Sequence, residues 1–149
     1  VRAFTESGKV YAAPRSIETL VVYYNADLTK YPAETLAEYE QLAKDNKNND
    51  RLSLIGKFDD IYYAYGFIRG NGGYVFGRNP DGSINVYDIG LDSEGAMKGL
   101  AELTEYARNC IPQDIFEKKG EAIIDKLFTS GRAIAVVNGP WALEKYAKA

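Results

Sequence analysis

One stretch decides the fold: Ala133-Ile134-Ala135-Val136-Val137-Asn138-Gly139-Pro140-Trp141. Its first five residues are all apolar and three of them are β-branched, which is typical of a strand buried on both faces. Gly139 and Pro140 then start a helix, because proline at the first helical position has no N–H to leave unpaired. A buried strand that runs directly into a helix indicates an α/β protein.

Further strands are predicted on either side of this stretch. Residues 52–55 form a short apolar run that Gly56 stops. Residues 19–24 are rich in β-branched and aromatic side chains, so we expect a strand covered on both faces. The turn at Gly8-Lys9 predicts a hairpin or paired strands near the beginning of the chain, and residues 79–82 (Asn-Pro-Asp-Gly) predict a turn between two extended segments.

Two helices are predicted in the first half of the chain. The first begins at Thr35, with Glu38 three residues later, which is a capping-box pattern. Asp59 or Asp60 caps the second, whose inward face is expected to carry Ile61, Ala64, Tyr65 and Ile68. The glycine-rich segment 70–73 ends that helix, and because it follows a helix it does not fit a phosphate-binding loop.

Two longer helices are predicted in the second half. One runs from Asp92 or Ser93 to about Arg108, and its inward residues are expected to be Met97, Leu100, Leu103 and Ala107. The other spans 116–128, with its apolar side formed by Ile123, Ile124, Leu127 and Phe128. Strands therefore alternate with helices, which predicts the α/β class. Neither a repeat nor a linker divides the chain, so we expect one domain over residues 1–149.

The composition argues against several kinds of function. There is no histidine, which removes Ser-His-Asp and Cys-His catalysis and the commonest zinc ligand, so no metal or other cofactor is expected. The net charge of −3, without a long basic run, gives no support for nucleic-acid binding. The single cysteine, Cys110, cannot form an internal disulfide and is expected to be buried or inert. The start at Val1, with no signal peptide, indicates a piece of a longer protein.

Aromatic residues mark two candidate binding positions. Tyr62 and Tyr63 follow the strand 52–55 on the first turn of a helix, and Trp141 has the same position after the strand 133–137. In α/β sheets ligands bind at such strand-to-helix turns. A structural role for these aromatic residues remains the alternative, and the adjacent carboxylates Asp59 and Asp60 serve either as a helix cap or as ligand contacts.

Six segments, in this order, resemble the maltose-binding protein family, a branch of the extracellular solute-binding proteins. They are residues 8–14 (Gly-Lys-Val-Tyr-Ala-Ala-Pro), Glu18 leading into 24–28 (Tyr-Asn-Ala-Asp-Leu), 35–38 (Thr-Leu-Ala-Glu), 71–74 (Asn-Gly-Gly-Tyr), 120–131 and 138–141 (Asn-Gly-Pro-Trp). The resemblance runs from about Gly8 to Trp141. It implies one lobe of a two-lobed, periplasmic-binding-protein-like (type II) fold, with a central sheet flanked by helices and with the first lobe missing.

The resemblance also implies a set of sugar contacts: Asp60, Tyr62, Tyr63 and Trp141, with Glu18 near the hinge. This chain departs from the family at several positions. Asp60 stands where the family has glutamate, Tyr63 where it has phenylalanine, and Glu121 where it has a tyrosine. The stacking of sugar rings on aromatic faces, with carboxylates holding the hydroxyls, agrees with these residue types.

The expected function is therefore binding of maltose or maltodextrin by the extracytoplasmic receptor of an ATP-driven (ABC) sugar importer. Its partners would be the importer's permease subunits and the missing first lobe. The receptor would be periplasmic, or lipid-anchored at the surface of a Gram-positive bacterium, and would not be an enzyme.

Three alternatives stay open. The first is another oligosaccharide or small solute on the same scaffold. The second is an enzyme acting on glycosides through two of the carboxylates Asp59, Asp60, Glu18 and Glu121, which must then face one pocket. The third is a structural interaction domain, in which Tyr62, Tyr63 and Trp141 would be scattered or buried.

Overall fold

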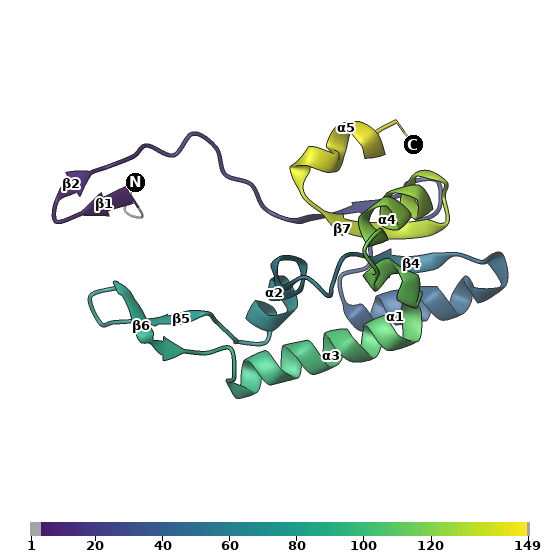
Figure 1. Cartoon of the computed structure of the whole chain (residues 1–149). Coiled ribbons are helices and arrows are strands. Elements are labelled where there is room, and N and C mark those ends of the chain that lie inside the picture. The colour runs from purple at the N-terminus through teal and green to yellow at the C-terminus, as the bar shows by residue number, and fades with distance from the viewer. Residues whose placement is uncertain (1–3, 149) are drawn as a thin grey trace.

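A three-stranded sheet lies at the centre of the computed structural model, which describes residues 4–148 (Figure 1). Its strands are β3 (Val21–Tyr24), β4 (Leu52–Ile55) and β7 (Ala133–Asn138), in the order β3-β7-β4. The central strand β7 is antiparallel to β3 and parallel to β4. Residues 133–137 are all buried, so the predicted central strand is confirmed.

Within residues 4–148, five α-helices accompany this sheet and confirm the α/β class. They are α1 (Leu36–Asp45), α2 (Ile61–Gly70), α3 (Glu94–Cys110), α4 (Gly120–Thr129) and α5 (Leu143–Tyr146). The capping box of α1 is formed as predicted, because Thr35 Oγ1 accepts from the Glu38 amide at 3.2 Å while the Glu38 carboxylate accepts from the Thr35 amide. A 3₁₀ turn at Gln113–Phe116 precedes α4, so the helix predicted over 116–128 begins later than expected. A second 3₁₀ turn, Pro140–Ala142, leads into α5.

The helices cover β4 and β7 and leave β3 open. Helices α1 and α3 contact β4, and α4 contacts β7. The strand predicted over 19–24 exists as β3, but the expectation that both of its faces are covered is wrong: Val21, Val22 and Tyr24 are 40%, 45% and 39% exposed. The reason is that the helices pack on the other two strands: α1 and α3 contact β4, which is also an edge strand but is buried, and α4 contacts β7.

Two predicted helix faces also need correction. On α3, Met97 and Leu100 are exposed, and the buried positions are Ala96, Gly99, Leu103 and Tyr106. On α2, Ala64 and Ile68 are buried as expected, whereas Ile61 is 59% exposed. These helices pack closely against each other through small residues, so the buried stripe is shifted relative to the largest apolar side chains.

Both predicted hairpins are present and extend to one side of the sheet (Figure 1). Strands β1 (Thr5–Glu6) and β2 (Lys9–Val10) pair around a turn in which Ser7 and Gly8 have positive φ. Strands β5 (Phe76–Arg78) and β6 (Ile84–Ile89) pair around the predicted turn at 79–82. Between β2 and β3, residues 11–20 run without regular secondary structure.

Cys110 is partly buried at the end of α3. Burial raises the pKa of its thiol, which disfavours the reactive thiolate. Within residues 4–148, no helix has both the length and the apolar character needed to cross a membrane.

Candidate functional site

The carboxyl ends of β4 and β7 bring two aromatic segments together. Because these strands are parallel neighbours, the turns that follow them lie at the same edge of the sheet. The ring centroids of Tyr62 and Trp141 are 6.3 Å apart, with 31° between their planes. Tyr63 meets Tyr62 edge to face at 5.6 Å. We call these three side chains, Tyr62, Tyr63 and Trp141, the aromatic wall.

The aromatic wall is open to solvent. Tyr62 is 52% and Trp141 54% exposed, while Tyr63 is partly buried. Within residues 4–148 the hydroxyls of Tyr62 and Tyr63 and the indole N–H of Trp141 make no hydrogen bond, so all three are available to a ligand. The reading that these aromatic residues are scattered or buried structural residues is thus wrong.

A small pocket of about 140 Å³ lies beside the aromatic wall. Tyr63 and Trp141 line it together with a set of charged and polar side chains: Lys57, Glu121, Asp125, Asn138 and Lys145. We call it the wall pocket. Burial raises the pKa of the Tyr63 hydroxyl, and the negative charges of Glu121 and Asp60 add to that rise.

The adjacent aspartates Asp59 and Asp60 make different contacts. Asp60 caps α2, and its Oδ1 accepts a hydrogen bond from the Tyr62 amide at 2.8 Å. Asp59 instead forms an ion pair with Lys57 at 2.9 Å. The expectation that one aspartate caps the helix is confirmed, and Asp60 lies at the start of the turn that carries Tyr62 and Tyr63. Asp59 and Asp60 do not face one pocket as a catalytic pair.

Glu18 comes from a different segment than the other predicted contacts. It is exposed in the irregular segment 11–20, and no hydrogen bond or ion pair within residues 4–148 joins it to the aromatic wall. The structure therefore brings Asp60 together with the three aromatic residues, and Glu18 stays a predicted contact.

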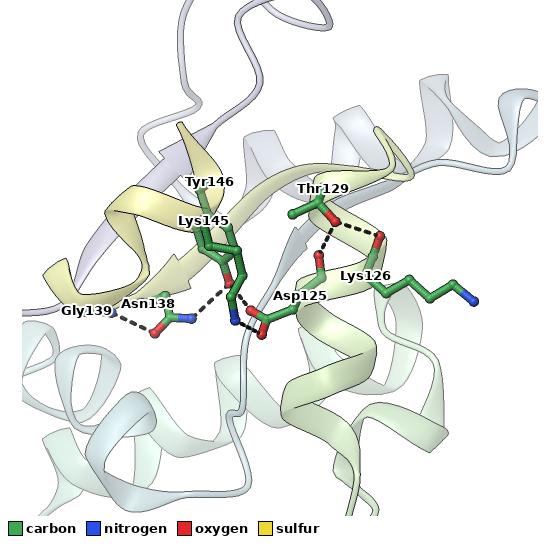
Figure 2. A network of polar contacts seen from close by, with 7 residues as sticks. All are labelled: Asp125, Lys126, Thr129, Asn138, Gly139, Lys145 and Tyr146. Carbon is green, nitrogen blue, oxygen red and sulfur yellow. Dashed lines mark hydrogen bonds and ion pairs between the residues drawn. The ribbon is translucent and has the colours of Figure 1, made fainter. Parts of the chain in front are cut away.

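A polar network fixes the turn that carries Trp141 (Figure 2). Asn138 Oδ1 accepts from the Gly139 amide at 2.8 Å, and Asn138 Nδ2 donates to the Tyr146 hydroxyl at 2.9 Å. That hydroxyl donates to Asp125 Oδ1 at 2.7 Å, and Lys145 pairs with the other oxygen of Asp125. Burial and the hydrogen bond to Asp125 raise the pKa of Tyr146. The turn is thus tied to α4 and α5 before any ligand arrives.

Two further contacts involve Gly139, which precedes the turn that carries the indole ring. The Tyr23 hydroxyl donates to the carbonyl of Gly139 at 2.9 Å, which ties the turn to β3. A Cβ atom at Gly139 would overlap the Trp141 ring, so the indole lies against this glycine. Glycine is required here for close approach, since the backbone φ of −90° suits any residue.

Sequence reasoning missed several residues of the wall pocket. Asn138 directly precedes the Gly139-Pro140-Trp141 turn, and this position in the sequence could have indicated that it lines the pocket. Lys57, Asp125 and Lys145 come from three separate elements, and nothing in the local sequence links them. No group of three or more side chains suited to hold a metal ion occurs in the part of the chain that the structure describes.

Comparisons with known proteins agree with this arrangement. The family described as "Bacterial extracellular solute-binding protein" matches residues 1–149. The galactooligosaccharide-binding protein of Bacillus subtilis (strain 168) is 38% identical over 144 residues, which cover 95% of this chain and 34% of that protein. The maltodextrin-binding protein MdxE of the same strain is 34% identical over 152 residues, which cover 97% and 36%.

A solved structure shows the same fold. The maltose-binding periplasmic protein MalE of Listeria monocytogenes, crystallised with maltose, superposes with a TM-score of 0.83 at 34% identity, over 99% of this chain and 39% of that one. The chain therefore has the fold of one part of a periplasmic binding protein of this type and spans just over a third of the length of these relatives. The family consists of solute-binding proteins and not of enzymes. Because its members are extracellular, the expected extracytoplasmic location is confirmed. With its fold and its whole length matched, the chain belongs to the bacterial extracellular solute-binding protein family.

Proposed function

We propose that this chain is one lobe of a two-lobed sugar receptor and that its aromatic wall binds an α-linked gluco-oligosaccharide. The observation that carries the proposal is the exposed pair of Tyr62 and Trp141, whose ring planes are tilted by 31°. Sugar rings have apolar faces that stack on such surfaces. Asp60, beside the wall, supplies an acceptor for sugar hydroxyls.

The rest of the receptor's action follows from this geometry. The aromatic wall is an open surface, so a second lobe would supply the opposing half of the site and close over the sugar about a hinge. We place Glu18 near that hinge, outside the wall itself. The closed receptor would deliver its sugar to the permease subunits of an ABC importer, from the periplasm or from a lipid anchor at the cell surface. No catalysis is proposed.

A β-galacto-oligosaccharide is the second candidate ligand. It is favoured by the 38% identity to a galactooligosaccharide-binding protein, and the aromatic wall suits either ring. The two sugars differ in the orientation of hydroxyls and in linkage, which polar groups and not stacking must distinguish.

The test is an amide NMR titration of the chain with maltotriose and, separately, with β-1,4-galactotriose. Shifts confined to residues 60–63 and Trp141 are expected, with a Kd no tighter than about 1 mM, or about 4 kcal/mol, because half of the site is absent. Micromolar binding would show that the division of the site between lobes is wrong. Shifts at other residues would reject the aromatic wall. If neither sugar shifts any amide signal, in the chain or in a two-lobed protein that contains it, sugar binding is rejected.

The same samples test the remaining alternative. The anomeric proton signals of each sugar should stay unchanged, and any cleavage would favour a glycoside-acting enzyme. Trp141→Ala should weaken binding by about fivefold or more, roughly 1 kcal/mol, through loss of the stacking surface. The matched control is Tyr87→Ala on β6, which removes an aromatic side chain that is 95% exposed and should leave binding unchanged.

A further inference from the structure

The wall pocket contains four charged side chains, and three of them already form ion pairs within the protein. Lys57 Nζ donates to Asp59 Oδ2 at 2.9 Å, to the Ile115 carbonyl at 3.1 Å and to the Glu117 carbonyl at 3.3 Å. An ammonium group has three N–H donors, so none is left for a ligand.

Asp125 and Lys145 neutralise each other's charge, and Lys145 uses one of its three N–H donors in this pair. Asp125 accepts from the Tyr146 hydroxyl through one oxygen and pairs with Lys145 through the other (Figure 2). Both charges are thus compensated within the protein. Any ligand that displaced them would have to break the network that holds the Trp141 turn.

Glu121 is the remaining charge. It is exposed in the first turn of α4, and within residues 4–148 it makes neither a hydrogen bond nor an ion pair. It lines the wall pocket with Tyr63 and Trp141, and its charge reaches Tyr63 strongly enough to raise the pKa of that hydroxyl. The pocket therefore offers a ligand one free carboxylate, which can only accept hydrogen bonds.

We infer that Glu121 is a specificity-determining residue of the site, which accepts hydrogen bonds from the hydroxyls of a neutral sugar ring and rejects acidic sugars. The inference rests on the proposed sugar binding and extends it to the charge of the ligand. A hydroxyl donates to the carboxylate in a charge-assisted hydrogen bond. A uronic acid would place a second negative charge beside the Glu121 carboxylate, which forms no ion pair within residues 4–148, and such repulsion is a common source of specificity.

The test compares maltotriose with maltotriose whose C6 hydroxymethyl groups are oxidised to carboxylates, by NMR titration of the full chain. The wild-type chain should bind the neutral sugar about tenfold more tightly or better. Glu121→Gln keeps the shape and removes the charge, so it should weaken maltotriose binding and bring the two sugars within about threefold of each other. Glu121→Lys should invert the preference.

Glu94→Gln is the matched control, because Glu94 also lies in the first turn of a helix, α3, and does not line the wall pocket. It should leave both affinities unchanged. Wild-type discrimination in Glu121→Gln and in Glu121→Lys would overturn the inference while leaving sugar binding intact. Absence of binding to maltotriose and to galactotriose, by the wild-type chain and by a two-lobed protein that contains it, would overturn the proposed function itself, and the two failures are thereby told apart.

Discussion

The Tyr106 hydroxyl on α3 forms two hydrogen bonds with the backbone of Leu54 on β4, donating to its carbonyl at 2.9 Å and accepting from its amide at 3.0 Å. Ser53 Oγ lies 2.9 Å from the same hydroxyl and therefore acts as its second donor. Tyr106 and Ser53 are both fully buried. Helix α3 is thus tied to the sheet by a saturated polar cluster inside an apolar core.

Removal of this hydroxyl should destabilise the fold. Tyr106→Phe leaves the buried Ser53 hydroxyl without its partner, which should lower the free energy of unfolding by about 2 kcal/mol. Urea denaturation followed by circular dichroism measures the change. Tyr39→Phe is the matched control, because the Tyr39 hydroxyl is buried and has no hydrogen-bond partner among the described residues. Its loss should change stability by less than about 0.5 kcal/mol. Equal effects of the two substitutions would contradict this account.

Gly139→Ala should disturb the aromatic wall. The added Cβ would overlap the indole of Trp141, so the ring must leave its present position beside Tyr62. The fluorescence maximum of this single tryptophan reports the change directly. Gly66→Ala on α2 is the control, because a Cβ there meets nothing within 4 Å. It should stabilise the helix by about 0.5–1 kcal/mol and leave the fluorescence unchanged. Unaltered fluorescence in Gly139→Ala would show that the glycine does not set the ring's position.

Asp125→Ala should cost more than loss of its ion-pair partner. It removes the acceptor of the Tyr146 hydroxyl, and Tyr146 is only 6% exposed, so a loss of about 1–3 kcal/mol is expected. Lys145→Ala removes only the ion pair at a side chain that is 55% exposed, which should cost less than about 1 kcal/mol. Thermal unfolding of both variants checks the order (Figure 2). A larger loss in Lys145→Ala would indicate that the ion pair, and not the tyrosine, holds the turn.

Stability should fall at high pH. Burial raises the pKa of Tyr106 and Tyr146 above the ordinary value of about 10. A raised pKa in the folded state means that the unfolded chain loses these protons first. The tyrosines therefore contribute their full stability below about pH 10, and the contribution declines above it, by up to about 1.4 kcal/mol per pH unit for each group. Urea midpoints between pH 8 and about pH 11 measure the decline. Tyr106→Phe should show a shallower slope, and an unchanged slope would contradict this assignment.

Local pattern was sufficient for most of the elements. The apolar run at 133–137, the capping box at Thr35 and the turn at 79–82 each depend on neighbouring residues, and each was predicted correctly. The buried face of α3 was not predicted correctly. Ala96 and Gly99 are buried in place of Met97 and Leu100 because α3 packs closely against α2. The exposed faces of β3 likewise depend on tertiary packing, because the helices contact β4 and β7 instead.

For the candidate site, the aromatic residues that follow buried strands could be found from local sequence alone, since a strand-to-helix turn is encoded within a few residues. That was enough to name Asp60, Tyr62, Tyr63 and Trp141. The contact of Tyr62 with Trp141, and the position of Glu121 as the one unpaired charge of the wall pocket within residues 4–148, depend on the tertiary structure. The reason is physical: the parallel pairing of β4 with β7 and the partners of Lys57 and Asp125 join segments far apart in the chain, and no local pattern encodes such contacts.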